Sequence, residues 1–371
     1  MNPVGIYIHV PFCRYKCPYC DFYSVRAKDE LLDAYTSETV RRINLLAPEG
    51  LSADTVYFGG GTPSLLGGKR IDTIMKALRN SVEISNNAEI TVEANPANDL
   101  GDFLKGCASS GINRLSLGMQ SALQFELSAI GRRHTPDDVL RAMEKSHNVG
   151  IDNISLDLML GIPMQTPASL NSSLSFIESS SPSHVSAYML KIEENTPFYR
   201  IKYALKIADE DGLADMYEQT FDRLEKAGYV QYEISNASKP GYESRHNIKY
   251  WNCDEYMGFG PSAHGFFNGR RYYYERSLDS YLSGAKPHDD DCFPDCGNIE
   301  EYIMLRLRLA EGLTNEGMKA KFGIDIPKAL RERAASPVMR PYCSCDDRGI
   351  RLTRKGMLIS NAIICDLIEL L

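Results

Sequence analysis

The sequence predicts an α/β fold: a partial (β/α)6, TIM-like barrel followed by a small, mostly helical domain of winged-helix type. Two observations predict the barrel. Six short apolar strands alternate with amphipathic helices, and polar or glycine-rich segments directly follow the strands. Near residue 291 the pattern changes to short helices with one small hairpin strand, which predicts the second domain. The 371 residues suffice for both, and the 43% hydrophobic content is that of an ordinary globular protein.

Strands and helices alternate through the first half of the chain. We expect strands at 6–10, 55–58, 89–93, 114–117, 153–158 and 184–189, with helices between them that include 30–46, 69–79, 136–149 and 167–179. This order implies parallel strands joined by crossover helices, in a barrel or in a doubly wound sheet. Cysteine- and glycine-rich segments lie at strand ends, where barrel enzymes build their sites, and this favours the barrel.

The rest of the chain divides into three parts at composition changes. A long amphipathic helix at 210–227, with Gly228 as its C-cap, closes a barrel core of residues 1–230. Residues 231–290 are rich in Tyr, Gly, Asn and His and are expected to be a connecting segment of loops and short strands. Residues 291–371 form the winged-helix-like domain, with helices expected at 299–310, 313–323 and 359–371 and a strand at 349–353.

Charge and composition limit the partners and the compartment. The net charge is −8, and residues 298–371 carry 12 Lys and Arg against 10 Asp and Glu, so neither the chain nor its last domain has the basic footprint of a nucleic-acid binder. The N-terminus lacks a basic stretch followed by an apolar run, and no segment reaches the length of a membrane span. Ten unevenly spaced cysteines fit a reducing compartment, so a cytoplasmic location is expected.

Cys13, Cys17 and Cys20 are the strongest functional signal in the chain. Three closely spaced thiolates can hold an iron–sulfur cubane while one of its four irons keeps an open position for chemistry. The same offsets would also place three small apolar residues on one face of a helix, but Pro11 and Pro18 disfavour a regular helix here. A structural zinc site would need a fourth ligand.

These cysteines resemble the Cys-x3-Cys-x2-Cys loop of the radical S-adenosylmethionine (SAM) superfamily. Residues 59–63, Gly-Gly-Gly-Thr-Pro, resemble its glycine-rich strand end, where backbone approaches the methionine part of the cofactor. The resemblance implies a 4Fe-4S cluster with SAM at the open iron. The positions that match the superfamily's SAM contacts are Tyr7, Gly60, Gly61, Thr62, Glu93, Gln120, Arg132 and Asp157.

The chemistry of these residues is compatible with SAM. Carboxylates such as Glu93 and Asp157 suit an ammonium or ribose hydroxyls, and Arg132 suits a carboxylate. Tyr19, next to the third cluster cysteine, is expected to flank the adenine. The alternative for Glu93 and Asp157 is a structural cap at a strand end.

A closer resemblance is to the oxygen-independent coproporphyrinogen oxidases and their relatives, in residues 6–13, 56–64, 116–120 and 157–163. Those oxidases carry a further cysteine two residues after the third cluster ligand, whereas this chain has Phe22 there. The Cys-Asp-Phe ending instead resembles the HemW-type haem chaperones, and Arg245–Trp251 resembles their His-Asn-x-x-Tyr-Trp motif.

The motif makes His246 the first candidate for a haem contact. Imidazole is a common axial haem ligand, and Tyr250 and Trp251 offer flat apolar surface for a porphyrin. A buried, hydrogen-bonded structural histidine is the alternative, and His264 is the second haem candidate.

The resemblance implies a haem chaperone that binds haem and transfers it to an acceptor protein, and no catalytic residue is assigned. The rivals are a coproporphyrinogen III oxidase, another radical SAM enzyme and a nucleic-acid regulator. An electron donor such as flavodoxin or ferredoxin is expected, and a homodimer is left open.

The pairs Cys292/Cys296 and Cys343/Cys345 allow a zinc site without the usual two-residue gap, and the other cysteines, Cys107, Cys253 and Cys365, are expected in the core.

Overall fold

Six parallel strands form the centre of the main sheet. A computed structural model describes residues 2–290 and 296–371. In these ranges a twelve-stranded sheet has six adjacent strands in chain order. They are β1 (Val4–Val10), β4 (Ser52–Gly60), β5 (Glu83–Ala94), β6 (Arg114–Gln120), β7 (Asn153–Leu160) and β8 (His184–Met189). Every neighbouring pair among them is parallel, which confirms the predicted α/β class and the strand–helix alternation.

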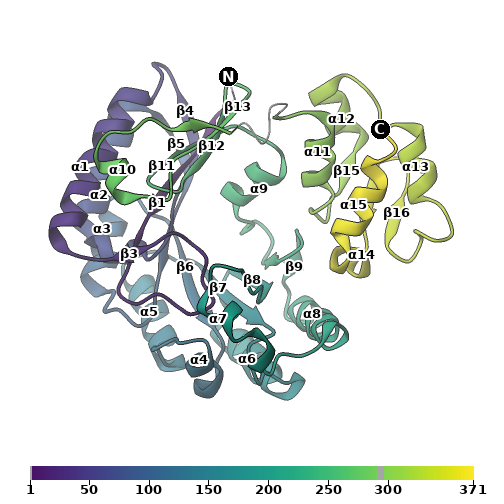
Figure 1. Ribbon diagram of the computed structural model, residues 1–371, viewed down its shortest axis with the longest axis horizontal. Helices are drawn as coiled ribbons and strands as arrows, with labels where there is room; N and C mark the ends of the chain where they lie inside the picture. The colour runs from purple at the N-terminus through teal and green to yellow at the C-terminus, as the bar shows by residue number, and fades with distance from the viewer. Residues whose placement is uncertain (1, 291–295) are drawn as a thin grey trace.

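The crossover helices line one side of this sheet. They are α1 (Asp29–Leu46), α2 (Gly67–Ser81), α3 (Gly101–Ser109), α4 (Gln124–Ala129), α5 (Pro136–Asn148), α6 (Pro167–Ser180) and α8 (Glu210–Lys226). Figure 1 shows them around the outside of a curved arc of strands. Helices α5 and α6 begin with capping boxes at Thr135 and Thr166, each followed by proline at the first helical position, so the sequence itself starts both helices.

Strands from later in the chain extend both edges of the sheet. Beyond β1 lie β11 (Tyr256–Phe259), which is parallel to it, and then β12 (His264–Phe267), β13 (Arg270–Tyr273) and β14 (His288–Asp289). Beyond β8 lies β10 (Asn236–Ser238), which is antiparallel to β8. Beyond β10 lies β9 (Val230–Gln231), which is antiparallel to β10. The strand order starts at β14 and ends at β9, so the arc stays open, as a partial barrel requires. The division at residues 230 and 290 stays a prediction.

The two faces of the strands differ in chemistry. Ile6, Ile8, Val56 and Phe58 are fully buried in the apolar core against the helices. The residues between them point to the other face, because side chains alternate along a strand. That inner face is polar, and half-buried positions interrupt otherwise buried strands there, at Tyr7 in β1 and at Asp157 in β7. This pattern indicates a lumen that solvent or a ligand can reach from the inside of the arc.

Helix α9 (Arg245–Trp251) lies in the opening of the arc. The Glu89 carboxylate of β5 accepts the first two helical N–H groups, those of Arg245 and His246, each at 3.1 Å. These N–H groups have no partner within a helix, so a strand residue supplies the cap that the helix itself lacks.

The C-terminal unit is a small winged-helix-like arrangement. Its order is α11 (Ile299–Arg306), β15 (Leu313–Thr314), α12 (Asn315–Phe322), α13 (Lys328–Ala334), β16 (Cys343–Cys345), β17 (Gly349–Leu352), α14 (Arg354–Leu358) and α15 (Ser360–Ile368). The strands form an antiparallel sheet in the order β15-β17-β16. The first helix ends earlier than expected, and the helix expected at 359–371 is α15, which ends at Ile368. No helix in residues 2–290 or 296–371 has the length and apolar character needed to cross a membrane.

Candidate functional site

The three cysteines lie on one loop after β1. The loop runs between the short parallel strands β2 (Phe12–Cys13) and β3 (Val25–Arg26), and no helix forms in it. Cys13, Cys17 and Cys20 are all partly exposed, and the Cys20 N–H donates to the Cys17 carbonyl at 3.1 Å. The alternative of three core residues on a helix face is therefore wrong for this segment.

The cysteine loop fits a cluster better than a single metal ion. Among the described residues, no three His, Cys, Asp or Glu side chains converge on one ion position. A cubane does not require such convergence, because each thiolate binds a different iron. The Thr62 hydroxyl lies 3.5 Å from Cys13 Sγ and can hydrogen-bond it. Three thiols on one accessible loop therefore match the donor set of a cluster with one open iron.

The glycine-rich end of β4 is joined to the start of the cysteine loop. The Gly61 N–H donates to the Val10 carbonyl at 2.8 Å, and the Thr62 N–H donates to the Phe12 carbonyl at 2.7 Å. Gly60 has φ +104°, and a Cβ there would lie 2.5 Å from the His9 ring. These glycines are thus needed for the close approach of two protein segments, in addition to the approach to a cofactor that the sequence suggested.

Glu93 and Asp157 place two carboxyl groups in the lumen. Glu93 accepts hydrogen bonds from the Tyr57 hydroxyl at 2.8 Å and from the Gly60 N–H at 3.2 Å, and Asp157 accepts one from the Ser116 hydroxyl at 3.2 Å. Desolvation by the surrounding protein, together with the nearby Asp157 charge, raises the pKa of Glu93 to about 7. Desolvation likewise raises the pKa of Asp157 to about 6, although Arg132 opposes the shift. Neither carboxyl forms an ion pair with a described residue.

Arg132 connects this pair to the cysteine loop. It lies beyond α4, and Gly118 leaves room for its guanidinium, because a Cβ on Gly118 would lie 2.8 Å from it. Burial lowers its pKa, but Tyr19 and Cys17 raise it more, so the guanidinium stays charged. Its buried Nε has no hydrogen-bond partner among the described residues. Arg132 also lines a cavity of 170 Å³ beside Cys17 and Thr62.

The remaining predicted contacts surround the same lumen. Tyr19 is close enough to Arg132 to hydrogen-bond it. Desolvation raises the pKa of Tyr19, and Arg132 opposes this shift. Gln120, with φ +66°, ends β6 and accepts a hydrogen bond from the Tyr188 hydroxyl at 2.7 Å. The Tyr7 hydroxyl is 3.0 Å from His9 Nδ1. Desolvation, and then the charge of Glu93, raise the pKa of Tyr7. The structure thus brings the cysteine loop and the SAM candidates from β1, β4, β5, β6 and β7 to one side of the sheet.

His246 is buried on α9, in the opening of the arc. Its side chain is buried, its Nδ1 is 2.8 Å from the Thr55 hydroxyl, and its Nε2 is 2.8 Å from the Tyr250 hydroxyl. The ring stacks on Tyr57 with centroids 5.2 Å apart. Burial, with Lys249 and Arg114 nearby, lowers its pKa to about 3. This geometry favours the structural alternative, because both ring nitrogens already have partners.

Arg114 is a lumen residue that the sequence reasoning missed. It begins β6, is buried, and its charge acts on Glu93, Asp157, His184 and His246. The strict alternation of Arg114 with Ser116, Gly118 and Gln120 could have placed it on the polar face of that strand.

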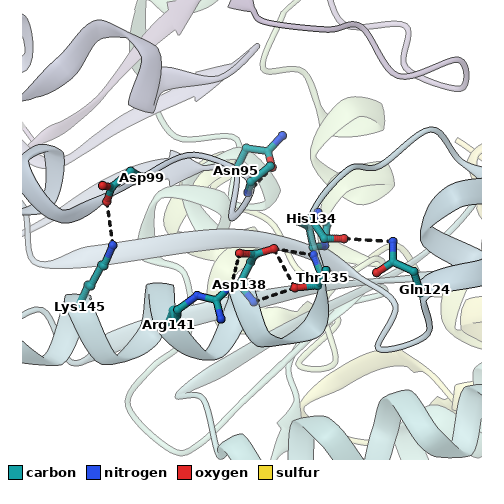
Figure 2. A network of polar contacts seen from close by, with 9 residues as sticks. Asn95, Asp99, Gln124, His134, Thr135, Asp138, Arg141 and Lys145 are labelled. Carbon is teal, nitrogen blue, oxygen red and sulfur yellow. Dashed lines mark hydrogen bonds and ion pairs between the residues drawn. The ribbon is translucent and has the colours of Figure 1, made fainter.

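A second polar network lies outside the lumen, near the ends of β5 and α5 (Figure 2). It surrounds a surface hollow of 220 Å³, where Lys145 pairs with Asp99 at 2.7 Å and Arg141 pairs with Asp138 at 2.5 Å. The Asp138 carboxylate also accepts the Thr135 N–H as part of the α5 capping box. These groups satisfy one another, so this network is read as structural.

The remaining cysteines form no recognisable site in the described residues. Cys292 lies outside those residues, and no described metal group includes Cys343 or Cys345 of β16. Cys107 and Cys253 are buried, as expected for small core residues. Cys365 is exposed on α15, so the expectation of a core position was wrong for it.

Comparison with known proteins covers nearly the whole chain. The model of the radical SAM superfamily matches residues 7–177, and that of the HemN C-terminal domain matches residues 298–359. The proteins named heme chaperone HemW are similar over full length. That of Lactococcus lactis is 35% identical over 98% of this chain and 96% of its own. That of Bacillus subtilis is 34% identical over 96% and 97%, and that of Escherichia coli is 33% identical over 98% of each.

Among solved structures, the chain resembles the coproporphyrinogen III oxidase HemN of Escherichia coli. The TM-score is 0.81, with 21% identity, over 100% of this chain and 91% of that one. This likeness shows the fold. The full-length similarity to the HemW proteins, at more than 30% identity, shows the family. The chain belongs to the HemW family of the radical SAM superfamily.

Proposed function

We propose that this protein is a haem chaperone, which binds haem and passes it to an acceptor protein. The observation that carries the proposal is full-length similarity to proteins named heme chaperone HemW, combined with Phe22 where the resembling oxidases carry a further cysteine. The Tyr-Trp motif on α9 supports the same assignment.

In this proposal Cys13, Cys17 and Cys20 hold a 4Fe-4S cluster, with SAM at the open iron. In the superfamily, the reduced cluster supplies the electron that cleaves SAM. Two features of the lumen support a SAM site beside the cysteine loop. Glu93 and Asp157 are half-buried carboxyls without an ion pair among the described residues, which is the environment that a cationic ligand would complete. Arg132 has an unpartnered Nε, which suits a carboxylate.

The other contacts are proposed by position. Gly60, Gly61 and Thr62 would lie along the methionine part of SAM, next to Tyr7 of β1. Gln120 would be a further SAM contact, and Tyr19 would flank the adenine. Each residue would bind and orient the cofactor, and none is assigned a proton-transfer step.

A low-potential electron donor is proposed to dock at the cysteine loop. Arg14, Lys16 and Arg26 of this loop are exposed, as is Arg133, which lies 3.5 Å over the Tyr15 ring. A basic rim on a chain of net charge −8 suits an acidic donor such as flavodoxin or ferredoxin. A cytoplasmic location agrees with the need of a cluster for a reducing compartment, and a homodimer stays a prediction.

The second candidate is an oxygen-independent coproporphyrinogen III oxidase. The shared fold with HemN favours it, whereas Phe22 in place of the further cysteine opposes it. Turnover of coproporphyrinogen III by the reconstituted protein would distinguish this enzyme from a chaperone.

Haem retention tests the proposed function. The cluster is reconstituted anaerobically, haem is added, the sample is desalted, and the absorption spectrum is recorded for the wild type and for His246→Ala. Haem retained by the wild type supports the chaperone, and wild type without haem overturns it. Loss in His246→Ala would tie the motif to haem binding, while equal retention would remove His246 from the site.

A further inference from the structure

A cavity of 420 Å³ lies beside β1, at the edge extended by β11 and β12. Its walls are mainly aromatic: Tyr250 from α9, Tyr256 from β11 and Phe266 from β12, with Phe22 from the cysteine loop. Tyr250 and Tyr256 pack edge to face with ring centroids 4.6 Å apart. The volume is in the range of small-molecule sites, and such walls suit a flat apolar ligand.

Two imidazoles line this cavity, and both ring nitrogens of His9 have hydrogen-bond partners, which leaves His264 as the candidate ligand. It begins β12, is exposed, and its ring stacks on Tyr273 with centroids 5.7 Å apart. All seven histidines lie in the described ranges, and only for His264 does no described residue hydrogen-bond the ring. Partial desolvation lowers its pKa, Asp290 opposes this shift, and Arg271 adds to it. An imidazole whose ring nitrogens no described residue hydrogen-bonds, beside aromatic walls, is equipped to ligate a metal.

Arg271 supplies a positive charge at the same cavity. It lines the wall, lies 5.1 Å from the centre of the Phe266 ring, and pairs with Glu301. A carboxylate arm of a planar ligand would share this guanidinium with Glu301.

The sequence motif on α9 reaches this cavity through Tyr250. The Tyr250 hydroxyl is 2.8 Å from His246 Nε2, and the Thr55 hydroxyl is 2.8 Å from Nδ1. His246 therefore fixes the Tyr250 ring in the cavity wall while staying buried behind it. In this arrangement His246 is a positioning residue.

We propose that this cavity is the haem site, with His264 as an axial ligand of the iron and the rings of Tyr250, Tyr256 and Phe266 against the macrocycle. The inference rests on the proposed chaperone function and assigns its site. It also places the occupant against Phe22, two residues after Cys20, so haem would touch the cysteine loop.

Two ligands, haemin and metal-free protoporphyrin IX, separate ligation from packing. The full chain with its cluster reconstituted is titrated with each. His264→Ala should weaken haemin binding more than about tenfold and move the Soret band, because even outer partners of metal ligands are worth roughly 10- to 100-fold in affinity. Protoporphyrin binding should stay unchanged, and added imidazole should restore the haemin spectrum.

Three further variants act as controls. His288→Ala removes another exposed histidine, which pairs with Glu275, and should change neither titration. Phe22→Ala, at an exposed position where folding is not at risk, should weaken both ligands. His246→Ala should weaken haemin without moving the Soret band of the haem that remains, since the axial ligand is intact.

The outcomes are distinguishable. If the wild type retains haem and His264→Ala binds haemin with the same affinity and spectrum, the cavity assignment is overturned and the chaperone function stands. Equal weakening of haemin and protoporphyrin in His264→Ala also overturns the ligand role. A wild type that does not retain haem overturns both proposals.

Discussion

Glu93 and Asp157 are half-buried acids with pKa values raised to about 7 and about 6. Desolvation is the first cause for both, and their mutual repulsion adds to it for Glu93. Arg132 and Arg114 act in the opposite direction but form no ion pair with them. At the residue scale, the lumen therefore holds negative charge at a cost in folding free energy that a cationic ligand would offset.

Glu93→Gln should flatten the pH dependence of stability in the ligand-free protein. Below the usual carboxyl pKa, Glu93 is protonated in both the folded and unfolded states. Between that value and about 7 the unfolded state ionises while the folded state keeps the proton, so the stability that protonated Glu93 contributes is lost as pH rises across this window. The fall in unfolding free energy from pH 5 to pH 8, measured by urea denaturation, should shrink by on the order of 1–2 kcal/mol.

The control for this change is Glu30→Gln, on the exposed first turn of α1. It removes a carboxyl from the surface and should leave the pH dependence as in the wild type. An unchanged slope in Glu93→Gln would contradict the desolvation argument.

Glu93→Gln should also bind SAM roughly tenfold or more weakly than the wild type, because hydrogen bonds to charged groups contribute about 1.5–3 kcal/mol.

Cys17→Ser should abolish cluster binding without unfolding the protein. The thiol is partly exposed on a loop, so the free energy of unfolding of the cluster-free chain should change by less than about 0.5 kcal/mol. Iron and sulfide content after reconstitution and the visible spectrum measure the loss. Cys365→Ser, at an exposed cysteine on α15, should reconstitute normally. A full cluster in Cys17→Ser would remove this residue from the ligand set.

At the element scale, the end of β4 and the cysteine loop form one unit. Backbone hydrogen bonds from Gly61 and Thr62 to Val10 and Phe12 join the two segments where the strands end. The same end of β4 donates the Gly60 N–H to Glu93 of β5. One strand end thus positions both the cysteine loop and a lumen carboxyl, so its backbone geometry matters more than its side chains.

Gly60→Ala should disrupt this unit. Its φ of +104° is strained for any residue with a Cβ, and the new methyl would lie 2.5 Å from the His9 ring. We expect a loss of about 2–5 kcal/mol in unfolding free energy, together with poor cluster reconstitution.

Gly50→Ala is the matched control for strain without contact. Gly50 has φ +75°, and nothing lies within 4 Å of its hypothetical Cβ, so only about 1 kcal/mol should be lost, with normal cluster content. Equal losses in the two variants would show that contact with His9 is unimportant.

At the scale of the whole molecule, charge is unevenly distributed. The chain carries −8 overall, yet exposed Arg14, Lys16 and Arg133 surround the cysteine loop. The C-terminal unit lies on the other side of the molecule from α1 and β3 (Figure 1). A local basic rim can steer an acidic partner even when the whole protein is acidic, because screening limits the field to roughly 10 Å at ordinary salt.

Reversal of Arg14, Lys16 and Arg133 of this rim to Glu should slow cluster reduction by an acidic donor such as flavodoxin. Steering is worth about 10- to 1000-fold in association rate, so a decrease of at least tenfold is expected at low salt, and it should diminish as salt is added. Stopped-flow reduction kinetics measure it.

The same net charge change placed elsewhere provides the control. Lys328, Arg340 and Lys355 are exposed in the C-terminal unit, and their reversal to Glu should leave the rate close to wild type. Equal slowing by both sets would indicate a response to net charge and would contradict docking at the rim.

The helical and strand pattern was predictable because local chemistry decides it. Alternating apolar runs placed the six parallel strands, and Thr135 and Thr166 with their prolines set the starts of α5 and α6. The edge strands β9 to β14 were harder to predict, since strands of two to four residues gain their stability from neighbours that are distant in sequence. The C-terminal helix bounds shifted for the same reason.

The sequence by itself determined the cysteine loop, the order of strands and helices and the family. The spacing of the cysteines, the hydrophobic periodicity and the positions of the glycines can all be identified without tertiary information. Only the tertiary structure decided what Arg114, His246 and His264 face. Arg114 proved to lie in the lumen, and His246 became a buried partner of Tyr250. His264 lies beside aromatic walls, and no described residue hydrogen-bonds its ring. The physical reason is that burial and hydrogen bonding of a side chain depend on segments folded against it from elsewhere in the chain, which no local pattern records.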